Sequence, residues 1–295
     1  MIAVVSHDAG GAEILSSYVK KFPATYSFVL EGPALSVFQR KLGKISAESL
    51  VDAVSNADEI LTGTSWQSDL EKQAIVLAKE SGKKSVSFLD HWVNYQERFL
   101  FRNRRVLPDE IWTGDEDAFA LAQKTFPDST IKLVNNPYFE SLEAELLSIK
   151  VKKQDRMGDR LLFVCENIRD HAATTKLQTG QDVWGFTEEE AIHFFFDNSS
   201  KITSRMESCT FRPHPSDPSG KYDWVIREYP NFDLEVSNKQ TLFEQIVEAD
   251  IILGCESMAM VIGLLAGKKV ISCIPPKGKK LSLPQKSIIE LRFLN

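Results

Sequence analysis

Short apolar runs alternate with stretches of helical periodicity from the first residues of the chain. In the first half we expect strands at 2–6, 26–30, 59–63, 85–89, 110–114 and 131–134. The helical patterns between them fall at about 11–21, 33–42, 47–56, 67–81 and 115–125. Continuous apolar strands separated by helices are typical of a parallel sheet covered on both faces. The pattern therefore predicts an α/β, Rossmann-like domain at residues 1–150.

The alternation restarts after a polar, basic segment at 148–160, which we interpret as the connection between two domains. Further strands are predicted at 161–165, 209–212, 232–236, 250–254 and 269–274. Helices are predicted at 187–198, 241–248 and 257–266, and the last segment, 283–295, is also predicted to be helical. Thr187 and Glu190 form a capping box at the start of the first of these helices. We therefore predict a second Rossmann-like domain at 151–295, with the two parallel sheets facing across a cleft and ligands bound at the carboxyl ends of the strands.

Composition narrows the class of protein. Of 295 residues, 43% are hydrophobic and 26% are charged, which is typical of a soluble globular protein, and the net charge of −6 argues against a broad nucleic-acid surface. No apolar run reaches the ~18 residues of a membrane-spanning helix, and the first residues lack the pattern of a signal peptide. The four cysteines lie in or beside apolar segments without zinc-site spacing. We expect a cytoplasmic protein with reduced cysteines and at most peripheral membrane contact.

The segment "SHDAGGAEIL" (6–15) joins the first predicted strand to a helix. Gly10 and Gly11 allow a tight turn, and the amides of the helix start can bind an anion. His7 and Asp8 are candidates for proton transfer. The alternative is an ordinary strand-to-helix turn.

Two further strand ends carry polar side chains next to aromatic rings. Thr64 and Ser65 follow one strand, and Asp90, His91 and Tyr95 follow the next. Fixed polar groups beside aromatic faces suit a sugar-like ligand. The alternative is that the aromatic side chains are interior packing and that Asp90 caps a helix.

The segment "FRPHPSD" (211–217) holds a histidine between two prolines at the end of a strand. The prolines fix the backbone, so that Arg212 and His214 are presented for a phosphate group. Later in the chain, "GCESMAM" (254–260) places Glu256 before Ser257 at a helix start. Ser257 is a natural N-cap, the amides behind it, starting at Met258, can bind phosphate, and Glu256 can accept hydrogen bonds from ribose hydroxyls.

The order of these motifs resembles the C-terminal domain of GT-B glycosyltransferases. It is similar to bacterial enzymes that use CMP-activated acidic sugars (sialyl- and Kdo-transferase-like proteins) and to the polyol-phosphate polymerases of wall teichoic acid, which carry an HP motif and a serine-bearing turn at the nucleotide phosphates. "VNNPYFES" (134–141) resembles a segment near the domain junction of many GT-B proteins. Where CMP-sugar enzymes have paired serines, this chain has Glu256-Ser257. It also lacks the E-x7-E pattern of retaining enzymes, which favours inversion.

The resemblance implies an inverting, metal-independent glycosyltransferase that moves a sugar from a nucleotide donor, such as a CMP-linked sugar, to a glycan or lipid-linked acceptor, without a cofactor. The first domain would hold the acceptor and supply the base, with Asp8 as first candidate and His7 or Asp90 as alternatives. The second would hold the donor phosphates through Arg212, His214 and the amides at Ser257. Two other functions remain open: a sugar-nucleotide epimerase or hydrolase of the same fold, and a non-catalytic nucleotide-sugar-binding protein.

Overall fold

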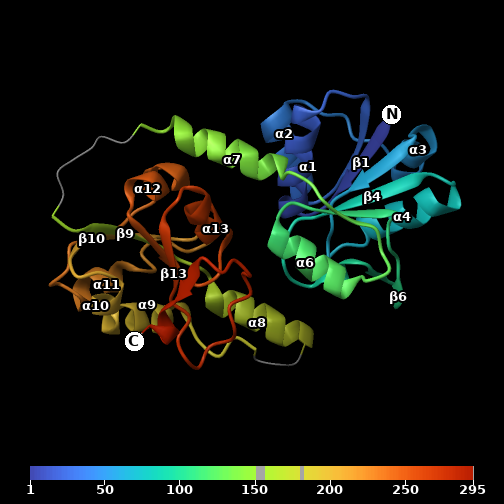
Figure 1. Cartoon of the computed structure of the whole chain (residues 1–295). Helices are drawn as coiled ribbons and strands as arrows, with labels where there is room; N and C mark the ends of the chain where they lie inside the picture. The colour runs from blue at the N-terminus through green and yellow to red at the C-terminus, as the bar shows by residue number, and fades with distance from the viewer. Residues whose placement is uncertain (151–156, 180–182, 295) are drawn as a thin grey trace. The chain divides into compact units, whose positions relative to one another are not determined.

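The computed structural model describes residues 1–150, 157–179 and 183–294, and the chain divides into two compact units, Met1–Ser141 and Leu142–Asn295 (Figure 1). Each unit is built around one six-stranded sheet. The division falls within helix α7 (Pro137–Ser148), which the sequence pattern did not predict. The predicted connection at 148–160 includes residues outside the described part of the chain, and its end already belongs to strand β9 (Asp159–Val164).

The sheet of the first unit has the order β2-β1-β3-β4-β7-β8, and all its strands are parallel. The strands are β1 (Ile2–Ser6), β2 (Tyr26–Leu30), β3 (Glu59–Thr62), β4 (Lys84–Leu89), β7 (Glu110–Thr113) and β8 (Ile131–Leu133). The chain adds β2 on one side of β1 and then β3 on the other side, so the strand order reverses between β1 and β3. In open α/β sheets ligands bind beyond the carboxyl ends of the strands at such a reversal.

Helices cover both faces of this sheet, as the apolar pattern requires. Helices α1 (Ala9–Lys21) and α2 (Pro33–Leu42) bury Leu15 and Phe38 against one face. Helices α3 (Leu50–Asn56) and α4 (Leu70–Glu80) bury Ala53 and Ala74 against the other face. Helix α6 (Glu116–Thr125) contributes Ala122 to a core cluster that also contains Ile75 of α4. A single turn, α5 (Tyr95–Arg98), and a small hairpin of β5 (Leu100–Phe101) and β6 (Arg104–Arg105) complete the unit.

The sheet of the second unit has the order β11-β10-β9-β12-β13-β14, again entirely parallel. Besides β9, its strands are β10 (Met206–Arg212), β11 (Leu234–Val236), β12 (Ile251–Gly254), β13 (Lys269–Ser272) and β14 (Ile288–Glu290). The succession reverses between β9 and β12, as in dinucleotide-binding Rossmann domains. The predicted α/β class and the two parallel sheets are therefore confirmed.

Two groups of helices pack on this second sheet. Helices α9 (Glu188–Asp197) and α11 (Asp223–Glu228) enclose the main core with Phe195, Phe211 and Tyr222. Helix α13 (Met258–Leu265) packs Gly263 closely on Ile252 and Val270, and α12 (Leu242–Glu248) lies before β12 in the chain. Helices α8 (Ile168–Thr179) and α10 (Ser199–Ile202) were not predicted.

The structure confirms the predicted capping box of α9 and corrects the end of the chain. The Thr187 side chain accepts the Glu190 amide, and Glu190 accepts the Thr187 amide. The segment predicted to be helical at 283–295 instead contains β14, which pairs with β13, and a 3-10 turn at Leu291–Phe293. Pairing with the sheet edge outweighs the weak helical periodicity, because it buries Ile288. Within the described residues, no helix is long and apolar enough to cross a membrane.

Candidate functional site

His7 and Asp8 follow β1 directly, at the reversal in the first sheet. The His7 Nδ1 and Asp8 Oδ1 atoms are 2.7 Å apart, and the two side chains keep 27% and 22% of their surface exposed. Asp8 is the N-cap residue of α1, yet its side chain makes no capping hydrogen bond. On the other side of the ring, a Cβ at Gly32, which has a φ of 51°, would lie 2.7 Å from His7 Nε2. The imidazole is therefore oriented by a carboxylate, the arrangement of a histidine base.

A buried glutamate that the sequence analysis missed supports this pair. The His7 backbone N–H donates to Glu71 Oε1 over 2.7 Å, and Glu71 lies in the first turn of α4 with only 2% of its surface exposed. Among the described residues, Glu71 Oε2 has no hydrogen-bond partner. Burial raises the pKa of Glu71 to about 7, and the hydrogen bond from His7 offsets only part of that effect. The polar residue lies in a helix, so strand-end reasoning could not find it.

The Asp90 side chain, which follows β4, lies against Gly10 at the start of α1, where an anion had been predicted to bind. A Cβ on Gly10 would clash with Asp90 Oδ2, so any other residue there would force this paired carboxylate to move. Asp90 Oδ1 lies 2.6 Å from Arg98 Nη1 and accepts the Thr64 hydroxyl at 2.9 Å. The Asp90 and Arg98 side chains are only 6% and 5% exposed. The structure thus brings Thr64 and Asp90 together, within an ion pair that Asp90 forms with Arg98.

Gly11, predicted at an anion-binding helix start, and Ser65, predicted to contact a sugar, both have structural roles in this unit. A Cβ on Gly11 would lie 3.2 Å from Gly63 Cα, so α1 and the turn after β3 approach closely. Ser65 is fully buried and accepts the amides of Gln67 and Ser68.

The two ring-bearing residues of the predicted sugar site, Tyr95 and His91, differ in placement. Tyr95 is buried in a core cluster with Phe99 and Phe126, as the interior-packing alternative anticipated. His91 is half-buried, and its Nδ1 accepts the Trp92 amide at 3.0 Å. Their contact with a sugar stays a prediction.

In the second unit, the HP loop (residues 212–217) begins at Arg212, the last residue of β10. The Ser216 amide donates to His214 Nδ1 at 3.2 Å, and the Ser216 hydroxyl lies 2.7 Å from the same atom. Because an amide can only donate, Nδ1 must be the acceptor, and the neutral ring carries its proton on Nε2. Within the described parts of the chain, Nε2 has no protein partner. His214 therefore presents an N–H donor of fixed orientation.

Asp217 fixes the backbone of the HP loop. Its side chain is fully buried, Oδ2 accepts the His214 amide at 2.7 Å, and Oδ1 lies 2.7 Å from Lys221 Nζ. Lys221 also bridges to Glu188 of α9 at 2.6 Å. Arg212, by contrast, donates through Nη1 to Gln240 O and Gln245 Oε1, so part of its guanidinium already serves the protein.

The turn between β12 and α13 lies at the reversal of the second sheet. The backbone N–H groups of Cys255, Glu256 and Ser257 all donate to Glu166 Oε1, at 2.7, 2.9 and 3.2 Å. We call these three residues the amide turn. Ser257 is the N-cap residue of α13 as predicted, but its side chain makes no capping hydrogen bond, and Met258 begins the helix.

Glu256, predicted to meet ribose, already has protein partners. Its carboxylate forms an ion pair with Lys279 and accepts the Ser282 hydroxyl at 2.8 Å. Lys279 in turn lies 3.9 Å from the centre of the Trp184 ring. The Glu256 carboxylate is only 9% exposed, so a ribose contact would require it to exchange these partners.

A second residue overlooked in the sequence is His171 of α8. Burial is the largest cause of the lowered pKa of His171, followed by the proximity of His214, and Asp170, Glu256 and Lys279 also act on it. The helix that carries it follows Glu166 and Asn167 at the end of β9. The strand-end rule applied to "LLFVC" would have identified this segment.

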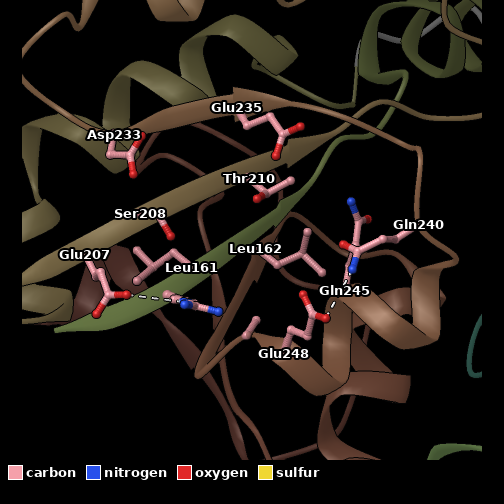
Figure 2. Close-up of a pocket in the computed structure, with 12 residues that line it drawn as sticks. Leu161, Leu162, Glu207, Ser208, Thr210, Asp233, Glu235, Gln240, Gln245 and Glu248 are labelled. Atoms are coloured by element: carbon pink, nitrogen blue, oxygen red, sulfur yellow. Dashed lines mark hydrogen bonds and ion pairs between the residues drawn. The ribbon is translucent and has the colours of Figure 1, made fainter. Parts of the chain in front are cut away.

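A polar groove of about 270 Å³ lies elsewhere on the second unit (Figure 2). Figure 2 shows Glu207, Ser208 and Thr210 along β10 and Gln245 with Glu248 from α12. The groove extends from the starts of β9 and β10 to Gln240 and Gln245, the two residues that accept hydrogen bonds from Arg212 at the end of β10. Within the ranges that the structure describes, no group of three or more His, Cys, Asp or Glu side chains could hold a metal ion.

Comparison with known proteins establishes similarity of fold. No protein-family model and no curated protein sequence matches the chain. A UDP-GlcNAc 2-epimerase from Neisseria meningitidis, solved with UDP-GlcNAc bound, superposes with a TM-score of 0.62 at 12% identity over 92% of this chain and 81% of that chain. The UDP-GlcNAc 2-epimerase from Methanocaldococcus jannaschii gives a TM-score of 0.54 at 11% identity, covering 92% and 83%. The S. aureus MnaA–UDP structure gives 0.55 at 11%, covering 92% and 78%.

These similarities support the GT-B fold that the motifs implied. They do not reach the finer resemblance to enzymes of CMP-activated sugars, which is not confirmed. At identities of 11–12% they establish the fold alone, with two Rossmann-like domains of GT-B type.

Proposed function

We propose that the chain is an enzyme that binds a nucleotide sugar and transfers the sugar to an acceptor hydroxyl group. The observation that carries this proposal is His214, whose Nε2–H is fixed at the carboxyl end of β10 by Ser216 and Asp217. Such a donor suits a phosphate oxygen and can stabilise the charge that develops on a leaving nucleotide. Lys279 and His171 add further positive or ionisable groups near the same strand ends.

The reaction type rests on the first unit. His7 and Asp8 form an oriented pair that can take a proton from an acceptor hydroxyl, with either Asp8 itself or His7 as the base. Asp90 is a weaker candidate than Asp8, because it is buried and paired with Arg98. In this proposal the first unit serves the acceptor and the second serves the donor, and the phosphate is stabilised by protein groups rather than a metal ion.

A second candidate is a sugar-nucleotide 2-epimerase, which is favoured by the fold similarity to UDP-GlcNAc 2-epimerases. A product assay with nucleotide sugar and no acceptor separates the two. An epimerase yields a new sugar nucleotide, whereas a transferase yields only slow hydrolysis until an acceptor is added. A binding protein would show no turnover with any acceptor.

The first experiment is a thermal-shift screen with CMP, CDP, UDP and GDP. A ligand at about 100 times its dissociation constant stabilises the folded protein by roughly 2.7 kcal/mol, which is easily measured. We expect stabilisation by the nucleotide of the natural donor. If none of the four nucleotides shifts the unfolding temperature, nucleotide-sugar binding is refuted.

A further inference from the structure

The amide turn is already occupied by an anion of the protein itself. One carboxylate oxygen, Glu166 Oε1, accepts all three N–H groups of residues 255–257. Glu166 comes from the end of β9, so its carboxylate reaches across the reversal in strand order to the neighbouring strand end. Its residue surface is only 8% exposed.

Consecutive amides that converge before a helix are the usual protein site for a phosphate oxygen. A carboxylate and a phosphate compete for such a site, because both are oxyanions that accept several N–H groups at once. The Ser257 amide, predicted to bind the donor phosphate, is one of the three that Glu166 engages.

We propose that Glu166 is the resident anion of the amide turn, and that a ligand phosphate binds there only by displacing it. This inference rests on the proposed function, since it concerns the phosphate site of that function. Glu166 is then an affinity-determining residue. It keeps the amide turn preformed without a ligand, and its displacement reduces the favourable free energy of phosphate binding.

The surroundings of Glu166 make its displacement depend on pH. The ionisable groups that act on it are Glu256 in the turn and the thiols of Cys165, Cys255 and Cys273. Burial raises the pKa of each of these thiols, so they stay neutral, and Glu256 is the charged neighbour.

Burial also raises the pKa of Glu166 to about 7, although the three amides act in the opposite direction. Above pH 7 a phosphate must therefore displace a carboxylate ion, whereas below pH 7 it displaces a neutral acid that holds the amides less strongly. Once displaced beside a phosphate, the carboxylate gains a like-charged neighbour, so we expect binding to take up a proton.

The test is calorimetric titration of the full chain and of Glu166→Gln with UDP-GlcNAc at pH 6 and pH 8. Glutamine keeps the oxygen that accepts the amides and removes the charge. The phosphates of UDP-GlcNAc carry no proton that titrates in this range, so pH effects arise from the protein. Glu244→Gln is the matched control, because Glu244 also accepts a backbone amide, that of Thr241, in the capping box of α12. Inorganic pyrophosphate is a second probe that lacks both base and sugar.

We expect Glu166→Gln to bind UDP-GlcNAc at least tenfold more tightly than the wild type at pH 8 and to lose part of the wild-type pH dependence. Glu244→Gln should match the wild type. Equal or weaker binding by Glu166→Gln, with an unchanged pH profile, would overturn the inference and leave the proposed function standing. If pyrophosphate shows the gain but UDP-GlcNAc and the four nucleotides do not bind, the inference stands and the proposed function fails. If no probe binds either protein, both fail.

Discussion

Replacing Glu71 by glutamine should change the pH dependence of folding in a way that can be calculated. In the folded protein the pKa of Glu71 is raised from its ordinary 4.5 to about 7, mainly by burial. Between these two values the folded state holds a proton that the unfolded state has lost. The stability associated with this proton is therefore present below pH 4.5 and is lost as the pH rises through 7. At about 1.4 kcal/mol per pKa unit, the ionised carboxylate costs roughly 3 kcal/mol above pH 7.

Glu71→Gln removes this cost while keeping an oxygen for the His7 amide. The glutamine NH₂ takes the place of Glu71 Oε2, which has no hydrogen-bond partner within the described residues. Burying this unpaired NH₂ lowers stability by the same amount at every pH. Because that penalty is the same at both pH values, it drops out when the free energies of unfolding in urea at pH 5 and pH 8 are compared. From pH 5 to pH 8, the free energy of unfolding of the variant should rise by about 2–3 kcal/mol relative to that of the wild type. Glu80→Gln, exposed on the same helix, should show no such gain. If the two variants behave alike, the burial argument for Glu71 is wrong.

Three further predictions concern the site. Gly10→Ala should lower stability by about 1–3 kcal/mol in urea unfolding, because its Cβ would meet Asp90 Oδ2; unchanged stability would show that this contact can relax freely. Asp8→Asn should leave nucleotide affinity nearly intact and reduce turnover by about 10²–10⁴, as for loss of a general base, and a loss of affinity instead would reverse the roles of the two units. Nucleotide binding should persist in EDTA; loss that magnesium or manganese restores would count against the metal-independent proposal.

Much of the fold could be predicted because its signals are local. The buried parallel strands read as continuous apolar runs, so β1, β9 and β12 were located to within two residues. Helix α8 escaped detection because its sequence, "IRDHAATTKLQT", is polar and lacks an apolar stripe. The edge strand β14 was mistaken for helix, since it becomes a strand only by pairing with β13.

The site could be predicted only in part, for a related reason. Strand-end reasoning predicted that His7, His214 and Ser257 follow strand ends, and they lie beyond β1, β10 and β12. Their roles in binding or catalysis stay predictions. Strand-end reasoning could not show that carboxylates from elsewhere in the chain, Asp90 and Glu166, already lie against the helix starts that were expected to hold an external anion. Contacts between residues so far apart in sequence follow from strand order, which the apolar pattern does not specify.

The measurement that tests the central claim most directly is nucleotide affinity in His214→Ala. With the nucleotide selected by the thermal-shift screen, we predict a dissociation constant about 10- to 150-fold higher than that of the wild type, the scale of one lost hydrogen bond to a charged group. His193→Ala is the control, because His193, on α9, forms a hydrogen bond with the Tyr229 hydroxyl and has no assigned ligand. This variant should bind nucleotide as the wild type does. Normal binding by His214→Ala would contradict the assignment of the HP loop to the nucleotide phosphate.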